Sequence, residues 1–475
     1  MTNRFQKGLE TINSEISVDN IPVEGEIPAW LKGTLLRTGP AQFEVGNRTY
    51  NHWFDGLAML RRFTFDGDGN QVSFSNKFVQ SEPYRVDNKT GKINFRGFSV
   101  DPCVTLFRAA MALFAPLPGM VNPVVSVQKI EDRYIAMTEM PLAVEIDPET
   151  LAIRGDFPVK NVPDAQTSTA HPLFDATAGE TYNVMVKFGM NHEYRVYKQF
   201  TDHYDIVGTV GAEEPAYMHS FAMSEKYIVL LEYPFRLPKL PQRNLLSMAT
   251  VQRPFIEAFE WMPDTPTRLR VISKETGELV NTVMTDAFFA FHAINAYDVE
   301  DAIVVDVSAY PDASVIDDLY LHNLRGNNFV SRGGDMTRLH IPLHGDTASQ
   351  TVIGTEQIEL PRINEAYNGR DYRYAYGASF QRGKDDFIDQ VVKIDALTNE
   401  THTWREDGCY PSEPIFVSAP NPTSEDDGVV LSVVLDTNND RSFMLVLDGQ
   451  SFEQIARANV PIALPFDFHG AFLER

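Results

Sequence analysis

The feature that most constrains this fold is a series of short β-type runs, separated by turns, that continues over nearly the whole chain. Each run has about four to eight β-branched or aromatic residues bounded by Asp, Gly, Asn or Pro, which is typical of strands joined by tight turns. The clearest runs are RRFTFDGDGNQVSFSNKFV (61–79), RYIAMTEMPLAVEIDPETLAI (133–153), YIVLLEYPF (227–235), AIVVDVSAY (302–310) and FMLVLDGQSF (443–452). No low-complexity linker interrupts them, so the pattern predicts one large all-β domain over residues 1–475.

Two segments depart from the strand pattern. In residues 103–123, Val104, Phe107, Met111 and Phe114 fall on one helical face, which Leu106 and its neighbours widen. Residues 235–263 form a proline-broken stretch of basic and large apolar side chains. Both are predicted to be inserts above the β scaffold. They are either core helices or a surface that contacts a membrane or a tunnel mouth.

The charge balance limits the partners. With 65 acidic and 41 basic residues, the net charge is −24, which disfavours nucleic-acid binding and attraction to anionic lipid. The two cysteines, Cys103 and Cys409, provide neither a disulfide framework nor a CxxC metal motif. There is no apolar leader at the start and no window long enough to span a membrane. These features favour a cytoplasmic protein with no obligatory protein partner.

Four of the eleven histidines differ from the rest because each lies among apolar or small residues beside a strand-like run. A neutral imidazole is costly to bury without partners, so four such sites favour either four separately satisfied core residues or a shared metal. The spacing of the four shows no local metal motif and does not decide between these alternatives. The four are His171, His219, His292 and His469.

Longer motifs resemble the carotenoid cleavage oxygenase family, in the family's order and almost from end to end. They are GTLLRTGPAQFEVGNRTYNHWFDGLAMLRRFTF (33–65), AHPLFD (170–175), MHSFAMSEKYIVLLEYP (218–234), FFAFHAINAYD (288–298), ELPRINEAYNGRDYRYAYG (359–377), YPSEPIFVSAPN (410–421) and FDFHGAF (466–472). The resemblance implies a seven-bladed β-propeller with a dome of loops and short helices over one face. The last strand of such a ring would close it against an early strand.

The resemblance also implies an iron centre with one Fe²⁺ per chain. By position, the ligands would be His171, His219, His292 and His469. Glu139, Glu359 and Glu413 would accept hydrogen bonds from three of these rings and leave His171 without a glutamate. Such carboxylates orient the imidazoles and supply negative charge at a distance. His52, although it lies in the longest motif, is expected to be structural.

The implied reaction adds both atoms of dioxygen across a C=C bond of a carotenoid or apocarotenoid to give aldehydes, with central, retinal-forming cleavage favoured. Trp53, Phe54, Phe288, Phe289 and Phe291 are candidates for the wall of a substrate tunnel. Leu106, Phe107, Met111 and Phe114 are candidates for a peripheral membrane patch.

Two alternatives stay open. Stilbene-cleaving relatives carry a lysine directly before the first glutamate, where this chain has Thr138, so a phenolic stilbene is disfavoured. A propeller of this kind can also be a non-catalytic carotenoid-binding protein, but such a protein has no reason to keep the full set of histidines and glutamates.

Overall fold

Hairpin-forming runs build seven antiparallel sheets arranged around one axis. The computed structural model describes residues 3–95, 97–99, 121–157, 164–239, 254–327, 329–384 and 386–474. Each predicted run forms strands. The DGDGN turn, for example, is a short 3-10 helix that ends at Asn70, whose φ of 48° is left-handed. The fold is therefore the predicted all-β seven-bladed propeller. That residues 1–475 act as a single domain remains a prediction.

Blades one to three come mainly from the first half of the chain, and the strands of each blade are named in their order across the sheet. Blade one contains β1 (Ser17–Val18), β7 (Gln71–Phe78), β6 (Leu57–Asp66), β3 (Lys32–Gln42) and β36 (Gly470–Glu474). Blade two contains β11 (Ile153–Asp156), β10 (Ala143–Ile146), β9 (Arg133–Met137) and β8 (Ser126–Ile130). Blade three contains β12 (Thr167–Ser168), β14 (Glu180–Lys187), β15 (His192–Gln199) and β16 (Tyr204–Ala212), with β13 (Leu173–Asp175) also paired to β14.

Blades four to seven follow along the chain. Blade four contains β17 (Ala222–Met223), β18 (Tyr227–Glu232), β21 (Thr267–Ser273) and β22 (Leu279–Thr285). Blade five contains β23 (Ala293–Val299), β24 (Ala302–Ala309), β25 (Asp335–Pro342) and β26 (Ser349–Gln357). Blade six contains β27 (Glu359–Ile363), β28 (Tyr374–Ser379), β29 (Gln390–Asp395) and β30 (Thr401–Trp404). Blade seven contains β2 (Val23–Gly25), β35 (Gln454–Val460), β34 (Arg441–Asp448), β33 (Gly428–Asp436) and β31 (Cys409–Pro411), with β32 (Ile415–Ser418) also paired to β33.

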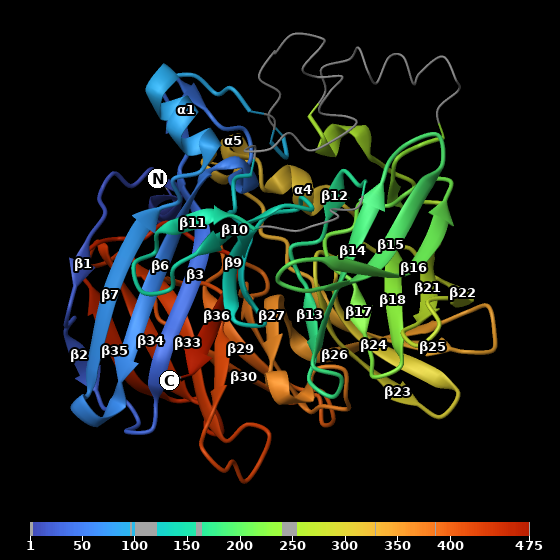
Figure 1. The fold of residues 1–475 in the computed structure, drawn as a ribbon. Coiled ribbons are helices and arrows are strands. Elements are labelled where there is room, and N and C mark those ends of the chain that lie inside the picture. The colour runs from blue at the N-terminus through green and yellow to red at the C-terminus, as the bar shows by residue number, and fades with distance from the viewer. Residues whose placement is uncertain are drawn as a thin grey trace.

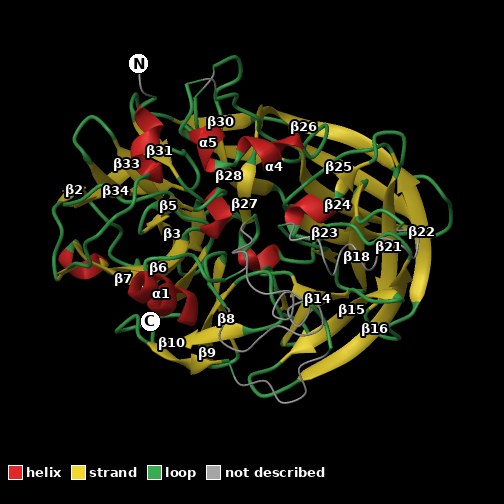
Figure 2. Ribbon diagram, turned by 90° about the horizontal axis from the view of Figure 1, so that it is seen from above, coloured by secondary structure: helices red, strands yellow, loops and turns green. Residues whose placement is uncertain are grey.

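The innermost strands of successive blades contact one another around the axis. β17 contacts β23, β23 contacts β27, β27 contacts β32, β32 contacts β36, and β36 contacts β8. Figure 2 shows the blades arranged around this central region. The start of each inner strand is therefore held close to the starts of its neighbours, whatever the sequence distance between them.

Both ends of the chain close the ring. β36 pairs with β3, with Gly470 opposite Arg37 and Glu474 opposite Gly33, as the sequence predicted for the last strand. β2 in turn pairs with β35 in blade seven. A Cβ at Gly470 would lie 2.2 Å from the carbonyl oxygen of Leu36, so a larger residue cannot stand where β36 docks.

Short helices lie over one face of the propeller (Figure 1). They include α1 (Glu82–Thr90), α4 (Ser314–Asp318), α5 (Leu321–Leu324) and the 3-10 helices η1 (Arg4–Leu9), η2 (Trp53–Asp55) and η4 (Ile256–Ala258). Two further 3-10 helices are turns within the blades: η3 (Gly67–Gly69) joins β6 to β7, and η5 (Glu365–Tyr367) lies between β27 and β28. Within the part of the chain that the structure describes, no helix combines the length and apolar character needed to cross a bilayer.

The two predicted inserts are covered only in part. Leu106, Phe107, Met111 and Phe114 lie outside the described residues, so the proposed patch is not seen. Of residues 235–263, the described parts form η4 and a ribbon in which β19 (Phe235–Arg236) pairs with β20 (Glu260–Trp261). The β4 (Glu44–Val45) and β5 (Arg48–Thr49) strands form a second two-stranded ribbon.

Candidate metal centre

Four histidines converge on the propeller axis. His219 lies just before β17, and His292 and His469 directly precede β23 and β36, while His171 lies between β12 and β13. One ring nitrogen from each lies within 4.8 Å of the others. The Nε2 atoms of His171 and His219 are 3.1 Å apart, and those of His292 and His469 are also 3.1 Å apart. The structure therefore brings together the four histidines that the sequence singled out.

Three of these rings are fixed from behind by glutamates. The distance from Nδ1 to the nearest carboxylate oxygen is 2.6 Å in each of the pairs His219–Glu139, His292–Glu359 and His469–Glu413. An ionised carboxylate accepts from Nδ1–H, which leaves the Nε2 lone pair facing the axis. These are the three glutamates that the resemblance indicated.

The seven residues come from seven different blades. His171, His219, His292 and His469 belong to blades three, four, five and one. Glu139, Glu359 and Glu413 come from the remaining blades two, six and seven. Every blade thus contributes one residue at the axis, and the glutamates of blades six and seven reach the histidines of neighbouring blades.

Two of the glutamates are held by tyrosine hydroxyls. The Tyr217 hydroxyl donates to Glu139 Oε1 at 2.7 Å, and the Tyr310 hydroxyl donates to Glu359 Oε1 at 2.8 Å. Both tyrosines are buried. Burial and the nearby glutamate charge raise the pKa of each tyrosine well above its ordinary value, so both hydroxyls stay protonated donors.

The third glutamate is held by guanidinium groups. Arg37 Nη1 donates to Glu413 Oε2 and Arg362 Nε donates to Oε1, each at 2.7 Å. The Gly470 amide adds a bond of 3.0 Å. Glu413 and Arg37 have fully buried side chains, so this is an ion pair inside the protein.

A bulge in β27 aims Glu359 inward. The pairing register with β28 shifts between Glu359 and Arg362, and Leu360 has a left-handed φ of 46°. The Leu360 amide donates to Glu359 Oε2 at 2.7 Å. One strand can therefore direct Glu359 toward His292 and Arg362 toward Glu413.

The electrostatics favour neutral rings at His171 and His469 and an ionised carboxylate at Glu359. Burial, together with the charges of neighbouring histidines and of Arg362, lowers the pKa of His171 and His469 well below 6.5. Burial alone would raise the pKa of Glu359, but its interactions with His292, Leu360 and Tyr310 lower it overall. Neutral imidazoles backed by carboxylates are a donor set that can bind a divalent transition metal.

The predicted tunnel aromatics separate into two groups. Phe291 lies against the site, with its ring centroid 5.3 Å from that of His219, and Phe54 packs on Phe291 at 5.8 Å. Trp53 is adjacent, 4.5 Å from Phe468. Phe289 lies behind Phe291, and Phe288 packs on Tyr233, farther from the histidines.

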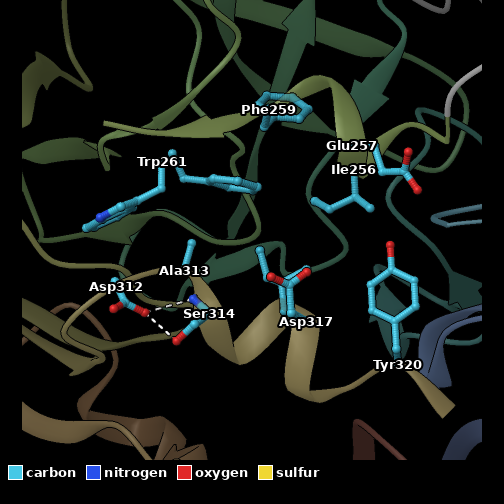
Figure 3. Close-up of a pocket in the computed structure, with 11 residues that line it drawn as sticks. Ile256, Glu257, Phe259, Trp261, Asp312, Ala313, Ser314, Asp317 and Tyr320 are labelled. Atoms are coloured by element: carbon cyan, nitrogen blue, oxygen red, sulfur yellow. Dashed lines mark hydrogen bonds between the residues drawn. The ribbon is translucent and has the colours of Figure 1, made fainter. Parts of the chain in front are cut away.

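A separate cavity of about 370 Å³ opens beyond this aromatic layer (Figure 3). It lies between η4 and α4, and its lining includes Phe259, Trp261, Tyr320 and the carboxylates of Glu257 and Asp317. Phe259 packs on Tyr217 with ring centroids 5.9 Å apart. The predicted tunnel residues are not part of the lining.

His52 has a local role. Its Nδ1 accepts from the Phe54 amide at 3.1 Å, and its Nε2 lies 3.0 Å from the Ile316 carbonyl oxygen. The side chain therefore caps η2 and ties it to α4. It is not among the clustered histidines.

Sequence reasoning did not identify Arg37, Arg362, Tyr217 and Tyr310. One signal was present: Arg37 stands inside the apolar run GTLLRTGP, where a buried charge requires a partner. Tyr217 is two residues before His219, and Arg362 is three after Glu359. Nothing in those spacings indicates which group each side chain reaches.

Known proteins resemble this chain over nearly its full length. A sequence model of the family described as retinal pigment epithelial membrane protein matches residues 9–474. Human β,β-carotene 15,15′-dioxygenase is 32% identical, over 95% of this chain and 91% of the relative. The carotenoid isomerooxygenase of Galleria mellonella is 33% identical, over 95% and 93%.

Solved structures agree with the fold. A cobalt-substituted structure of the Synechocystis apocarotenoid oxygenase has a TM-score of 0.86 at 24% identity, covering 99% of this chain and 98% of that chain. At this identity the match establishes the propeller architecture.

Proposed function

The chain belongs to the retinal pigment epithelial membrane protein family, that is, to the carotenoid cleavage oxygenases, and on this premise we propose that it is an iron(II) dioxygenase that cleaves a C=C bond of a carotenoid or apocarotenoid to give aldehydes. The single observation that carries this proposal is the axial cluster of four histidines with three carboxylate partners. Relatives named for carotenoid cleavage support the substrate class.

The residues fit one divalent metal per chain. His171, His219, His292 and His469 would bind it through the nitrogens that face the axis. Imidazole suits iron and several other transition metals, so the donor set alone does not select iron. A cobalt-substituted protein of the same fold supports a metal in this architecture. When bound, ferrous iron supplies the activation of dioxygen.

The remaining groups orient the ligands and exclude water. Glu139, Glu359 and Glu413 keep the Nδ1 proton on three rings and offset part of the metal charge. Phe291 and Phe54 present apolar surface beside the histidines, where a polyene would lie. We assign Phe289 to the support of Phe291 and give Phe288 a packing role with Tyr233.

We favour central, retinal-forming cleavage because relatives named for the 15,15′ reaction match most of the chain. The test is metal analysis after anaerobic purification, followed by incubation with β-carotene or an apocarotenal under ¹⁸O₂. Prompt reduction to alcohols preserves the label. We expect one iron per chain and label in both products. A protein that binds β-carotene but forms no oxygen-dependent aldehyde would instead be a carotenoid carrier.

The proposed membrane contact has its own test. We keep a cytoplasmic, peripherally attached enzyme as the working assignment, based on the apolar sequence of residues 103–123. Binding to neutral phosphatidylcholine vesicles should survive high salt, because apolar burial and not charge would drive it. Phe107→Asp with Phe114→Asp should abolish binding, whereas Leu397→Asp, at a residue 74% exposed elsewhere, should not. Binding that is reversed by salt would contradict the proposal.

A further inference from the structure

Glu413 is the one glutamate of the three that two arginines hold. Arg37 and Arg362 reach different oxygens of its carboxylate, each at 2.7 Å. The corresponding bonds on Glu139 and Glu359 come from the neutral hydroxyls of Tyr217 and Tyr310. The site therefore has two kinds of support, and the ionic kind serves only the histidine near the end of the chain.

The same two arginines hold the backbone on both sides of His469. Arg37 Nη2 donates to the Phe468 carbonyl oxygen, and Arg362 Nη2 donates to that of Gly470, each at 2.7 Å. Each guanidinium thus joins the carboxylate partner of His469 to the carbonyl group of a residue that adjoins His469 in the chain.

A second carboxylate completes the arrangement. Asp467 accepts from Arg37 through Nε and Nη2, and from Arg61 Nη1 at 2.8 Å. The side chains of Arg37, Arg61 and Asp467 are fully buried. Arg37 pairs all three of its guanidinium nitrogens, whereas Arg61 Nε and Nη2 have no partner among the described residues. The planar fork of Arg37 pairs two carboxylates at once, which an ammonium cannot do with the same geometry.

These contacts cross the place where the ring closes. Arg37 lies on β3 of blade one, Arg362 on β27 of blade six, and Glu413 between β31 and β32 of blade seven. His469 arrives with β36, which completes blade one from the opposite end of the chain. The other three histidines come from within blades three, four and five, where no pairing between the chain ends is needed.

We propose that Arg37 and Arg362 are positioning residues that clamp His469, so that metal binding and closure of the propeller by β36 stabilise each other. This inference rests on the proposed metal function. If the metal binds only when His469 is in place, binding must favour the closed ring, and loosening the clamp must weaken binding by the same linkage.

The first test uses the wild-type chain with Co²⁺ as the probe. Hydrogen–deuterium exchange is compared for residues 470–474 of β36 and 401–404 of β30, an outer strand that contributes nothing to the cluster. We expect Co²⁺ to slow exchange in β36 more than in β30. Equal protection of the two strands would overturn the proposal.

The second test uses Arg37→Lys and Arg362→Lys, with Arg338→Lys as the matched control. Arg338 forms a two-bond pair with the buried Asp306 in blade five, away from the histidines. We expect the clamp variants to bind Co²⁺ about 10- to 100-fold more weakly, with an altered visible spectrum of the bound ion. The control should change neither.

The outcomes separate the two proposals. Clamp variants that are less stable but keep wild-type Co²⁺ affinity would show a purely structural role and overturn the clamp, leaving the proposed function intact. Wild-type protein that binds neither Fe²⁺ nor Co²⁺ would overturn both. If the lysine variants do not fold, the exchange experiment on the wild type still decides.

Discussion

His469 and His171 lie in the same cluster, yet their surroundings differ. His469 is buried, bonded to Glu413 and flanked by peptide groups that Arg37 and Arg362 hold. His171 is half-buried, and among the described residues none of the three glutamates pairs with it. The comparison agrees with the proposal that the ligand delivered by a chain end is clamped by arginines, and it contrasts that ligand with His171, which lies inside a continuous blade.

The largest effect is expected from removing the supported ligand together with its strand. Deleting residues 469–475 should abolish metal binding and lower the free energy of unfolding by at least about 3 kcal/mol, because β3 loses its partner and the buried Glu413 loses two donors. Metal analysis and urea denaturation measure both effects. Full-length His469→Ala should lose the metal while keeping closure. Equal stability of the two variants would contradict the role of β36.

Single ligand removals compare the two surroundings directly. His292→Ala and His469→Ala should leave no stoichiometric iron after purification, because each removes a ligand that a glutamate holds in place. His171→Ala should weaken retention less if orientation of the ring matters. His203→Ala, on the surface beside Asp202, serves as the control. Greater iron loss in His171→Ala than in His469→Ala would contradict the expectation that the glutamate-supported ligand matters more for metal retention.

Lowering the pH should reduce the stability of the metal-free protein through both His469 and His171. Burial lowers the pKa of His171 and His469 well below 6.5, and that of His52 to about 3. Below pH 6.5 the unfolded chain takes up protons that the folded chain refuses, so the metal-free protein loses up to about 1.4 kcal/mol of stability per group per pH unit.

Carboxyl groups whose pKa burial raises oppose this trend, and they include Asp55, Asp318, Asp386 and Glu425. Burial raises the pKa of Asp55 to about 6, so the folded chain gains stability from that group as the pH falls below this value. We expect the three buried histidines to outweigh these carboxyl groups, so that the metal-free protein is less stable at pH 5.5 than at pH 7.5. Urea denaturation at pH 7.5 and 5.5 measures the difference. Unchanged or higher stability at pH 5.5 would mean that the folded chain takes up at least as many protons as the unfolded chain over this range, which would contradict the prediction.

The smallest effect on metal affinity is expected at the neutral tyrosine hydroxyls that hold the glutamates. Tyr310→Phe removes the hydroxyl that anchors Glu359 but leaves the bond from Leu360, so metal affinity should fall by about 10-fold or less. Titration of the metal-free protein with Co²⁺ gives the value. Tyr204→Phe, at a buried tyrosine whose hydroxyl makes only a 3.5 Å contact with the Pro141 carbonyl oxygen, should be neutral. If Tyr310→Phe lowered Co²⁺ affinity as much as Arg37→Lys does, the tyrosine and arginine supports would not differ in their effect on metal binding.

The sequence by itself determined the strands and turns and singled out four histidines, and its resemblance to a family indicated the three glutamates that join them. Alternating apolar runs and turn residues specify hairpins through local chemistry, and the motifs around His171, His219, His292 and His469 carried the family resemblance. It also predicted that the tail containing His469 closes the ring, which the pairing of β36 with β3 confirms.

Only the tertiary structure decided which of these side chains contact one another. Glu139 is 80 residues from His219 in sequence, and Arg37 is 376 residues from Glu413. Their contacts follow from the arrangement of blades about an axis, where inner strands meet regardless of sequence distance. The structure likewise placed Phe291 beside the histidines and Phe288 away from them. Both lie in one apolar run, and the run does not encode which way each ring faces.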